Sequence, residues 1–90
     1  MTPEEKRARE IWRKQYGRSW PRGWRVHFMT CGATCPQTKE VFVLADRPED
    51  AMDTLSHEFV HMRNSIDGLP DRHGPKFERE VRSRLKRVLK

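Results

Sequence analysis

Two histidines and a glutamate in the second half of the chain have the spacing of a metal-binding, proton-transferring group. Residues 57–61 read His-Glu-Phe-Val-His, an HExxH pattern. Residues four apart on a helix lie one above the other, so the imidazoles of His57 and His61 can hold one metal ion from the same side. Glu58 lies beside them, where its carboxylate can take a proton from a metal-bound water. The pattern therefore indicates hydrolytic metal chemistry with Glu58 as the general base.

A third ligand is expected from the residues that follow, because catalytic zinc usually has three protein ligands and an open fourth position. His73 is the first candidate, since a chain that turns back at Gly68 brings it to the open side of the ion. A carboxylate of Glu78 or Glu80 is the alternative ligand. Imidazole ligands favour one Zn²⁺ ion over magnesium or calcium. His27 remains outside this site, and we expect it to be an ordinary half-exposed histidine.

The residues after the HExxH pattern carry a resemblance to a known family. Residues 73–77 read His-Gly-Pro-Lys-Phe and open the next predicted helix. An HExxH helix followed by such a motif resembles the SprT-like and WLM-like zinc metallopeptidases. The resemblance covers about residues 46–89 and implies a minimal zincin-like domain, with zinc bound by the three histidines and Glu58 as general base. It also implies a metalloendopeptidase that acts on proteins or peptides, including, by analogy, DNA-associated proteins.

Hydrophobic periodicity predicts the elements that must position the site. A first helix begins at Pro3, with Thr2 as its cap and Glu5 completing a capping box, and it ends before Gly17. Two short strands follow. They are expected to form a small antiparallel sheet with a third strand that the sequence does not place. Their ranges are residues 24–29 and 40–44, and a connecting loop is predicted between them.

The HExxH motif lies in the most clearly predicted helix, which begins near a second capping box formed by Asp46 and Glu49 and ends at Gly68. Its core-facing stripe consists of Met52, Leu55, Phe59, Met62 and Ile66. A last helix begins near Pro75. Its stripe consists of Phe77, Val81, Leu85 and Val88. The predicted fold class is α+β, in the order helix, two strands, helix, helix.

Composition limits the class of protein. The chain has 90 residues, 34% hydrophobic and 36% charged, which predicts one domain over residues 1–90 with a lean core. No apolar run approaches the roughly 20 residues of a membrane helix, and no apolar segment follows the charged N-terminus. We therefore expect a cytoplasmic protein without a membrane span or secretory signal, and we expect a monomer.

The charge balance favours anionic partners. The net charge is +6 and the isoelectric point about 9.9, so nucleic acid is the first partner to consider. Candidate phosphate contacts on the last helix are Arg79, Arg82, Lys86 and Arg87, although such a run is commonly a solvated face. The competing function is a basic nucleic-acid-binding module with a structural zinc site. A third alternative is a peptidase that cleaves one regulatory protein without DNA. Glu58 favours an enzyme, because a structural zinc site does not require that carboxylate.

Substrate binding is expected along the strand of residues 40–44, where an extended peptide can pair with the main chain. Candidates for stabilising the developing oxyanion are Tyr16, His27 and Arg72.

Two cysteines and three tryptophans have alternative interpretations. Cys31 and Cys35 favour reduced thiols over a disulfide or a second metal site. Base stacking is an alternative role for the tryptophans, but a position in the core or at its rim is favoured, with Trp20 as the expected exception. The other two are Trp12 and Trp24.

Overall fold

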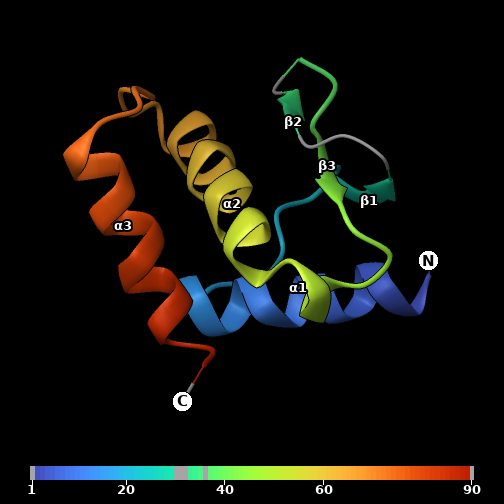
Figure 1. Cartoon of the computed structure of the whole chain (residues 1–90). Coiled ribbons are helices and arrows are strands. Elements are labelled where there is room, and N and C mark those ends of the chain that lie inside the picture. Colours follow the sequence, from blue (N-terminus) through green and yellow to red (C-terminus); the bar gives the residue numbers. More distant parts are fainter. Residues whose placement is uncertain (1, 30–32, 36, 90) are drawn as a thin grey trace.

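The computed structural model describes residues 2–29, 33–35 and 37–89 (Figure 1). It contains three α-helices and a three-stranded sheet, which confirms the α+β class. The helices and strands are α1 (Pro3–Tyr16), β1 (Arg25–Met29), β2 (Ala33–Cys35), β3 (Glu40–Leu44), α2 (Met52–Asp67) and α3 (Pro75–Lys86). No helix in the described part of the chain combines the length and apolar character needed to cross a bilayer.

Helix α1 has the predicted bounds, but its buried glutamate has a different partner. The Thr2 hydroxyl accepts a hydrogen bond from the Glu5 amide at 3.1 Å, and Gly17 ends the helix in the left-handed conformation. The capping-box role predicted for the Glu5 side chain is wrong. Its carboxylate, only 1% exposed, accepts hydrogen bonds from the Arg25 guanidinium at 2.9 and 3.1 Å and from the Val26 amide at 2.9 Å. A buried carboxylate needs several donors, and β1 supplies them.

The sheet has the order β1-β3-β2, so the predicted antiparallel pairing of the first and last strands is wrong. Strands β1 and β3 are parallel, with Val26 opposite Val41. The physical reason is β2, which lies in the segment predicted as a loop. It pairs antiparallel with the other edge of β3 and returns the chain, so that β3 runs in the same direction as β1.

The central position of β3 also contradicts the proposed substrate strand. Strand β1 pairs with β3 from Glu40 to Leu44, and β2 pairs with it from Glu40 to Phe42. Both edges of Glu40–Phe42 are therefore already hydrogen-bonded within the sheet, and an extended peptide cannot add there.

Helix α2 begins later than predicted. A single 3₁₀ turn occupies Pro48–Asp50, and α2 follows from Met52 without a side-chain cap. The expected capping box of Asp46 and Glu49 is therefore wrong. The Glu49 carboxylate instead accepts hydrogen bonds from Arg7 on α1. Glu49 thus forms an ion pair with α1, which is far away in the sequence, and does not cap its own helix.

The core lies where α1, the sheet and α2 meet. The rings of Trp12, Trp20 and Phe59 pack edge to face with centroids 5.4 to 5.8 Å apart. The Trp20 indole donates to the Trp24 carbonyl at 2.9 Å, so Trp20 is held at the rim of the core. The buried apolar residues of the core cluster are Ala8, Trp12, Trp24, Val26, Val41, Val43, Ala51, Leu55, Phe59 and Met62. The core interpretation is confirmed for Trp12 and Trp24, but the expected exception of Trp20 is wrong, because its ring also packs against the core.

Helix α3 packs against α2 and is tied at its C-terminal end to α1 (Figure 1). The guanidinium groups of Arg84 and Arg87 donate to the Gln15 carbonyl at 2.7 and 2.9 Å. Of the predicted α3 stripe only Phe77 is fully buried, and the other three residues are half-buried. On α2, Ile66 is 38% exposed, so the predicted stripe does not continue to the end of that helix.

Candidate metal centre

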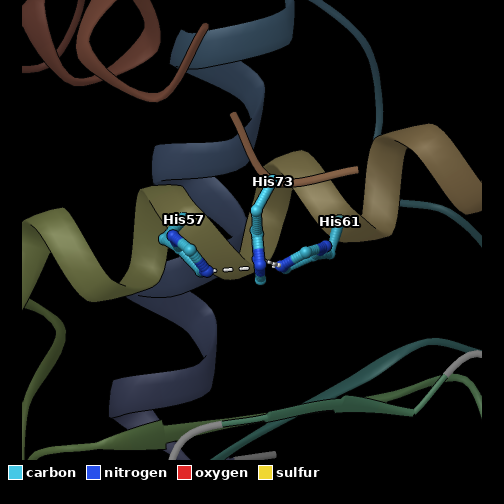
Figure 2. A group of neighbouring side chains, drawn as sticks. All are labelled: His57, His61 and His73. Carbon is cyan, nitrogen blue, oxygen red and sulfur yellow. Dashed lines mark hydrogen bonds between the residues drawn. The ribbon is translucent and has the colours of Figure 1, made fainter. Parts of the chain in front are cut away.

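Three histidines converge beside α2 (Figure 2). Helix α2 presents His57 and His61 one turn apart, and their Nε2 atoms are 3.2 Å apart. The Nε2 atom of His73, from the segment between α2 and α3, lies 2.8 Å from that of His61. One possible ligand atom from each ring lies within 4.8 Å of the others. The structure thus brings together the three histidines predicted as ligands.

The end of α2 explains how His73 reaches the other two histidines. Gly68 adopts a left-handed conformation with φ +67°, which glycine reaches without steric strain. The Leu69 amide then donates to the Asn64 carbonyl at 2.8 Å and closes the turn. The chain reverses and returns along α2 as far as Pro75, where α3 begins. His73 is therefore placed over the exposed side of α2.

The partner of His61 on its far side is Asp71, which sequence reasoning missed. Both carboxylate oxygens of Asp71 lie 2.8 to 2.9 Å from His61 Nδ1. A carboxylate only accepts hydrogen bonds, so Nδ1 carries the proton, and in the neutral ring the Nε2 lone pair faces the cluster. The missed signal was the acidic residue close to His73, since metal-ligating imidazoles commonly donate their other N–H to a carboxylate.

The donor set fits a divalent ion. Two nitrogens, each about 2.0–2.1 Å from a tetrahedral zinc ion, lie about 3.3 Å apart, close to the 3.2 and 2.8 Å measured here. Burial lowers the pKa of His57, and the neighbouring His61 and His73 lower it further, although Glu58 and Asp71 oppose the shift. A lowered pKa favours the neutral imidazole, which is the form that binds metals. These three histidines could therefore hold a metal ion.

The ring of Phe77 packs against all three imidazoles. Its ring centroid lies 4.9, 4.6 and 4.9 Å from those of His57, His61 and His73. The Phe77 side chain is only 5% exposed and comes from the first turn of α3. The sequence placed Phe77 on the apolar stripe of this helix but gave no indication that it contacts all three histidines. Helix α3 thus takes part in forming the centre.

The predicted carboxylates occupy different environments. Glu58 follows His57 on α2 and is buried, with 7% of the residue exposed. Glu80, an alternative ligand, accepts hydrogen bonds from Arg63 at 2.8 Å and Arg84 at 3.1 Å. Glu78 lies outside the group of potential ligands found among the described residues. The structure therefore favours His73 over both alternatives as the third ligand.

A cleft of about 400 Å³ opens between α2 and α3 beside the cluster. His57 forms part of its wall, so a molecule in the cleft would lie next to the imidazole of this residue. The remaining lining residues are Asp53, Thr54, Glu78, Val81 and Arg82. Acidic, basic and apolar side chains are all represented.

The oxyanion candidates have different surroundings. The guanidinium groups of Arg63 and Arg84 lie 5.6 and 4.3 Å from the centroid of the Tyr16 ring. Burial raises the pKa of the Tyr16 hydroxyl to about 12. His27 is half-exposed, as expected, and its Nε2 lies 2.9 Å from a carboxylate oxygen of Glu40. Neither joins the three-histidine cluster. Arg72 is exposed and lines a cavity with His73.

The basic residues of α3 are only partly free for a partner. Arg79, Arg82 and Lys86 are exposed and line a cavity of about 600 Å³. Arg87 is also exposed, but its guanidinium donates to the Gln15 carbonyl.

The cysteine interpretations stay predictions. Cys31 lies outside the described residues, and Cys35 ends β2.

The described residues form a small α+β domain with three imidazoles arranged to hold a metal ion. Comparison with protein-family models, curated proteins and solved structures returned no match. The proposed function therefore rests on the geometry of the site and on the motif resemblance.

Proposed function

We propose that this chain is a zinc-dependent metalloendopeptidase of the SprT-like type, with a minimal zincin-like fold. The observation that carries the proposal is the convergence of three Nε2 atoms beside a glutamate in an HExxH helix. His57, His61 and His73 would hold the ion, and the choice of zinc is supported by the all-imidazole donor set. A structural site usually has four protein ligands, whereas this cluster offers three.

Glu58 is the proposed general base. A zinc ion, when bound, supplies Lewis acidity that activates water and polarises a carbonyl. Glu58 accepts a proton from the attacking water as the new C–O bond forms. It then delivers that proton to the amine nitrogen as the C–N bond of the peptide breaks. The proton that leaves the attacking water is thus the proton that the departing amine receives.

The cleft between α2 and α3 is the proposed binding place for the substrate. It borders His57 directly, whereas β3 has no free edge over Glu40–Phe42. Its mixed lining suits a peptide, which presents amides together with apolar and charged side chains.

The decisive experiment compares the wild type with Glu58→Gln, using zinc-loaded protein and a fluorescently labelled unfolded protein as substrate. We expect hydrolysis to fall at least about 100-fold, because loss of a general base commonly reduces the rate by two to four orders of magnitude. Zinc content should stay at one ion per chain, since Glu58 is not a proposed ligand. The matched control is Glu10→Gln, an exposed glutamate on α1, which should leave the rate unchanged. Undiminished hydrolysis in Glu58→Gln would exclude this mechanism.

The exposed cations of α3 support a second role, contact with a polyanion such as DNA. Lys76, Arg79, Arg82 and Lys86 are all exposed around one cavity. Arg82 also lines the cleft beside His57, so a polyanion bound here would lie near the proposed substrate. This arrangement suits a peptidase whose substrate is itself bound to nucleic acid, and equally suits a basic binding module with structural zinc.

Salt dependence tests the second role independently of hydrolysis. If the four cations contact phosphates, the logarithm of duplex affinity should fall with the logarithm of salt concentration with a slope of about −3 to −4. Replacing Arg79 and Lys86 by alanine should reduce the slope by about 2, because each cation that neutralises a phosphate contributes about 1. Lys6→Ala, an exposed cation on α1, is the control. A shallow slope that the α3 variants leave unchanged would rule out phosphate contacts on this helix.

A further inference from the structure

We propose that Asp71 and Asn64 are positioning residues that hold His61 and the segment carrying His73 in the arrangement that binds zinc. The inference rests on the proposed function, because it assigns both residues to the same zinc centre. Asp71 does not belong to the group of potential ligands found among the described residues, and the hydrogen bonds of the Asn64 side chain run to Asp71 and Arg63. Both residues act through hydrogen bonds, first from Asn64 to Asp71 and then between Asp71 and His61.

Asp71 fixes the ring of His61. Its two carboxylate oxygens lie 2.8 and 2.9 Å from Nδ1, so a rotation of the imidazole would break both contacts. The same contacts keep the proton on Nδ1 and direct the opposite nitrogen toward His57 and His73. A charged acceptor on the far nitrogen also makes the ligating nitrogen a better electron donor to a metal.

Asn64 fixes Asp71 in turn. The Asn64 side chain is buried, 6% exposed, and its Nδ2 donates to Asp71 Oδ1 at 3.1 Å. Its amide oxygen accepts from Arg63 Nε at 3.1 Å, which settles the amide orientation because a guanidinium only donates. Arg63 also donates to Glu80 of α3 at 2.8 Å. The network thus extends from α3 through α2 to the metal centre.

The segment that carries His73 depends on this anchor. Residues 69–73 are all exposed, so burial of their side chains does not hold them in place. Asp71, two residues before His73, joins this segment to α2 through both His61 and Asn64. Without the carboxylate, the segment would keep the turn at Gly68 but would no longer be attached beside the cluster. Ordering His73 on metal binding would then cost more conformational entropy.

The test measures zinc affinity in Asp71→Asn and Asn64→Leu by competition with a chromophoric chelator. Loss of such an outer partner typically weakens metal binding 10- to 100-fold, and we expect weakening in that range for Asp71→Asn and of about tenfold for Asn64→Leu. Cobalt substitution adds a spectroscopic readout, because the visible absorption of Co²⁺ reports ligand geometry. We expect its bands to change in Asp71→Asn.

Asp67→Asn is the matched control. Asp67 ends α2 and its carboxylate pairs with Arg18 at 2.7 Å, not with a histidine. This variant should lose a hydrogen-bonded charge yet keep wild-type zinc affinity. Urea unfolding of each zinc-free variant establishes that affinity is measured on folded protein. Should Asp71→Asn fail to fold, Asn64→Leu still decides, because the hydrogen bonds of the Asn64 side chain run to Asp71 and Arg63 and not to a proposed ligand.

Unchanged zinc affinity in the two variants, with an unchanged cobalt spectrum, would overturn the inference. Zinc-dependent hydrolysis in the wild type together with unaffected variants would reject the positioning role alone. Conversely, weakened zinc binding in the variants of a wild type that hydrolyses no peptide would reject the proposed function and leave the positioning role standing.

Discussion

Removing the ring of Phe77 should reduce both the stability of the fold and the stabilisation that zinc provides. Phe77 is 5% exposed, and its ring lies 4.6 to 4.9 Å from each of the three imidazoles. Phenylalanine to alanine changes at buried sites cost about 3–5 kcal/mol, against a total of about 5–15 kcal/mol for a native domain. Phe77→Leu, which keeps part of the packing, is therefore the variant in which zinc binding can be measured.

The zinc contribution follows from linkage. At a zinc concentration 100 times the dissociation constant, the wild type gains about 2.7 kcal/mol of unfolding free energy. If the imidazoles lose their support and the affinity falls about tenfold, as for other residues that support ligands, the gain at the same concentration falls to about 1.4 kcal/mol. Phe77→Leu should thus show about half the zinc-induced stabilisation of the wild type.

Urea unfolding followed by circular dichroism, with and without zinc, measures both quantities. Leu85→Ala is the control, because Leu85 is half-buried on the same helix and makes none of the ring contacts with the imidazoles. It should lower stability without changing the zinc contribution. If zinc stabilises Phe77→Leu as much as the wild type, the ring packs the helix without positioning the ligands, and the proposed support of the imidazoles is refuted.

Three further outcomes follow from features that stabilise the fold. Gly68→Ala should lower the unfolding free energy by about 1–2 kcal/mol in urea titrations, because φ is +67° and no atom lies within 4 Å of an added Cβ, so that conformational strain is the only penalty. Burial alone raises the pKa of Glu5, but the hydrogen bonds from Arg25 and the Val26 amide outweigh it and lower the pKa below its usual 4.5. The ionised carboxylate therefore stabilises the fold above pH 4.5, and this contribution is lost as the pH falls through the lowered pKa. In urea titrations over that pH range, Glu5→Gln should lose less unfolding free energy than the wild type. Replacing Arg84 and Arg87 by alanine removes two charged donors from one carbonyl and should lower the melting temperature in calorimetry by at least about 4 °C, which corresponds to roughly 1 kcal/mol; an unchanged melting temperature would mean that these bonds contribute nothing measurable.

The grouping of the three histidines could be predicted from the sequence because it depends on local geometry. A spacing of four residues places His57 and His61 together on any helix, and a glycine stop after α2 brings the chain back. His73 is close enough in sequence for this turn to direct it toward the site, where the contacts of Asp71 then hold its segment. Their short sequence separation left few alternative arrangements.

The strand pairing and the buried partners could not be predicted in the same way. The direction of β1 relative to β3 depends on β2, which is three residues long and lies beside Gly32 and Pro36, residues typical of loops. Glu5 has the spacing of a capping box, but its carboxylate instead accepts hydrogen bonds from the Arg25 guanidinium and the Val26 amide of β1. Such outcomes are decided by tertiary contacts, for which local periodicity carries no signal.

The compact spacing of the ligands along the chain has an engineering consequence. His57, Glu58, His61, Asn64, Asp71, His73 and Phe77 all lie in the continuous stretch of residues 57–77. Helix α1 and the sheet contribute by burying the opposite face of α2, which includes Phe59 and Met62 within this stretch. The stretch is therefore a cassette that can be grafted in one piece onto a host helical hairpin, provided that the host buries the same apolar face.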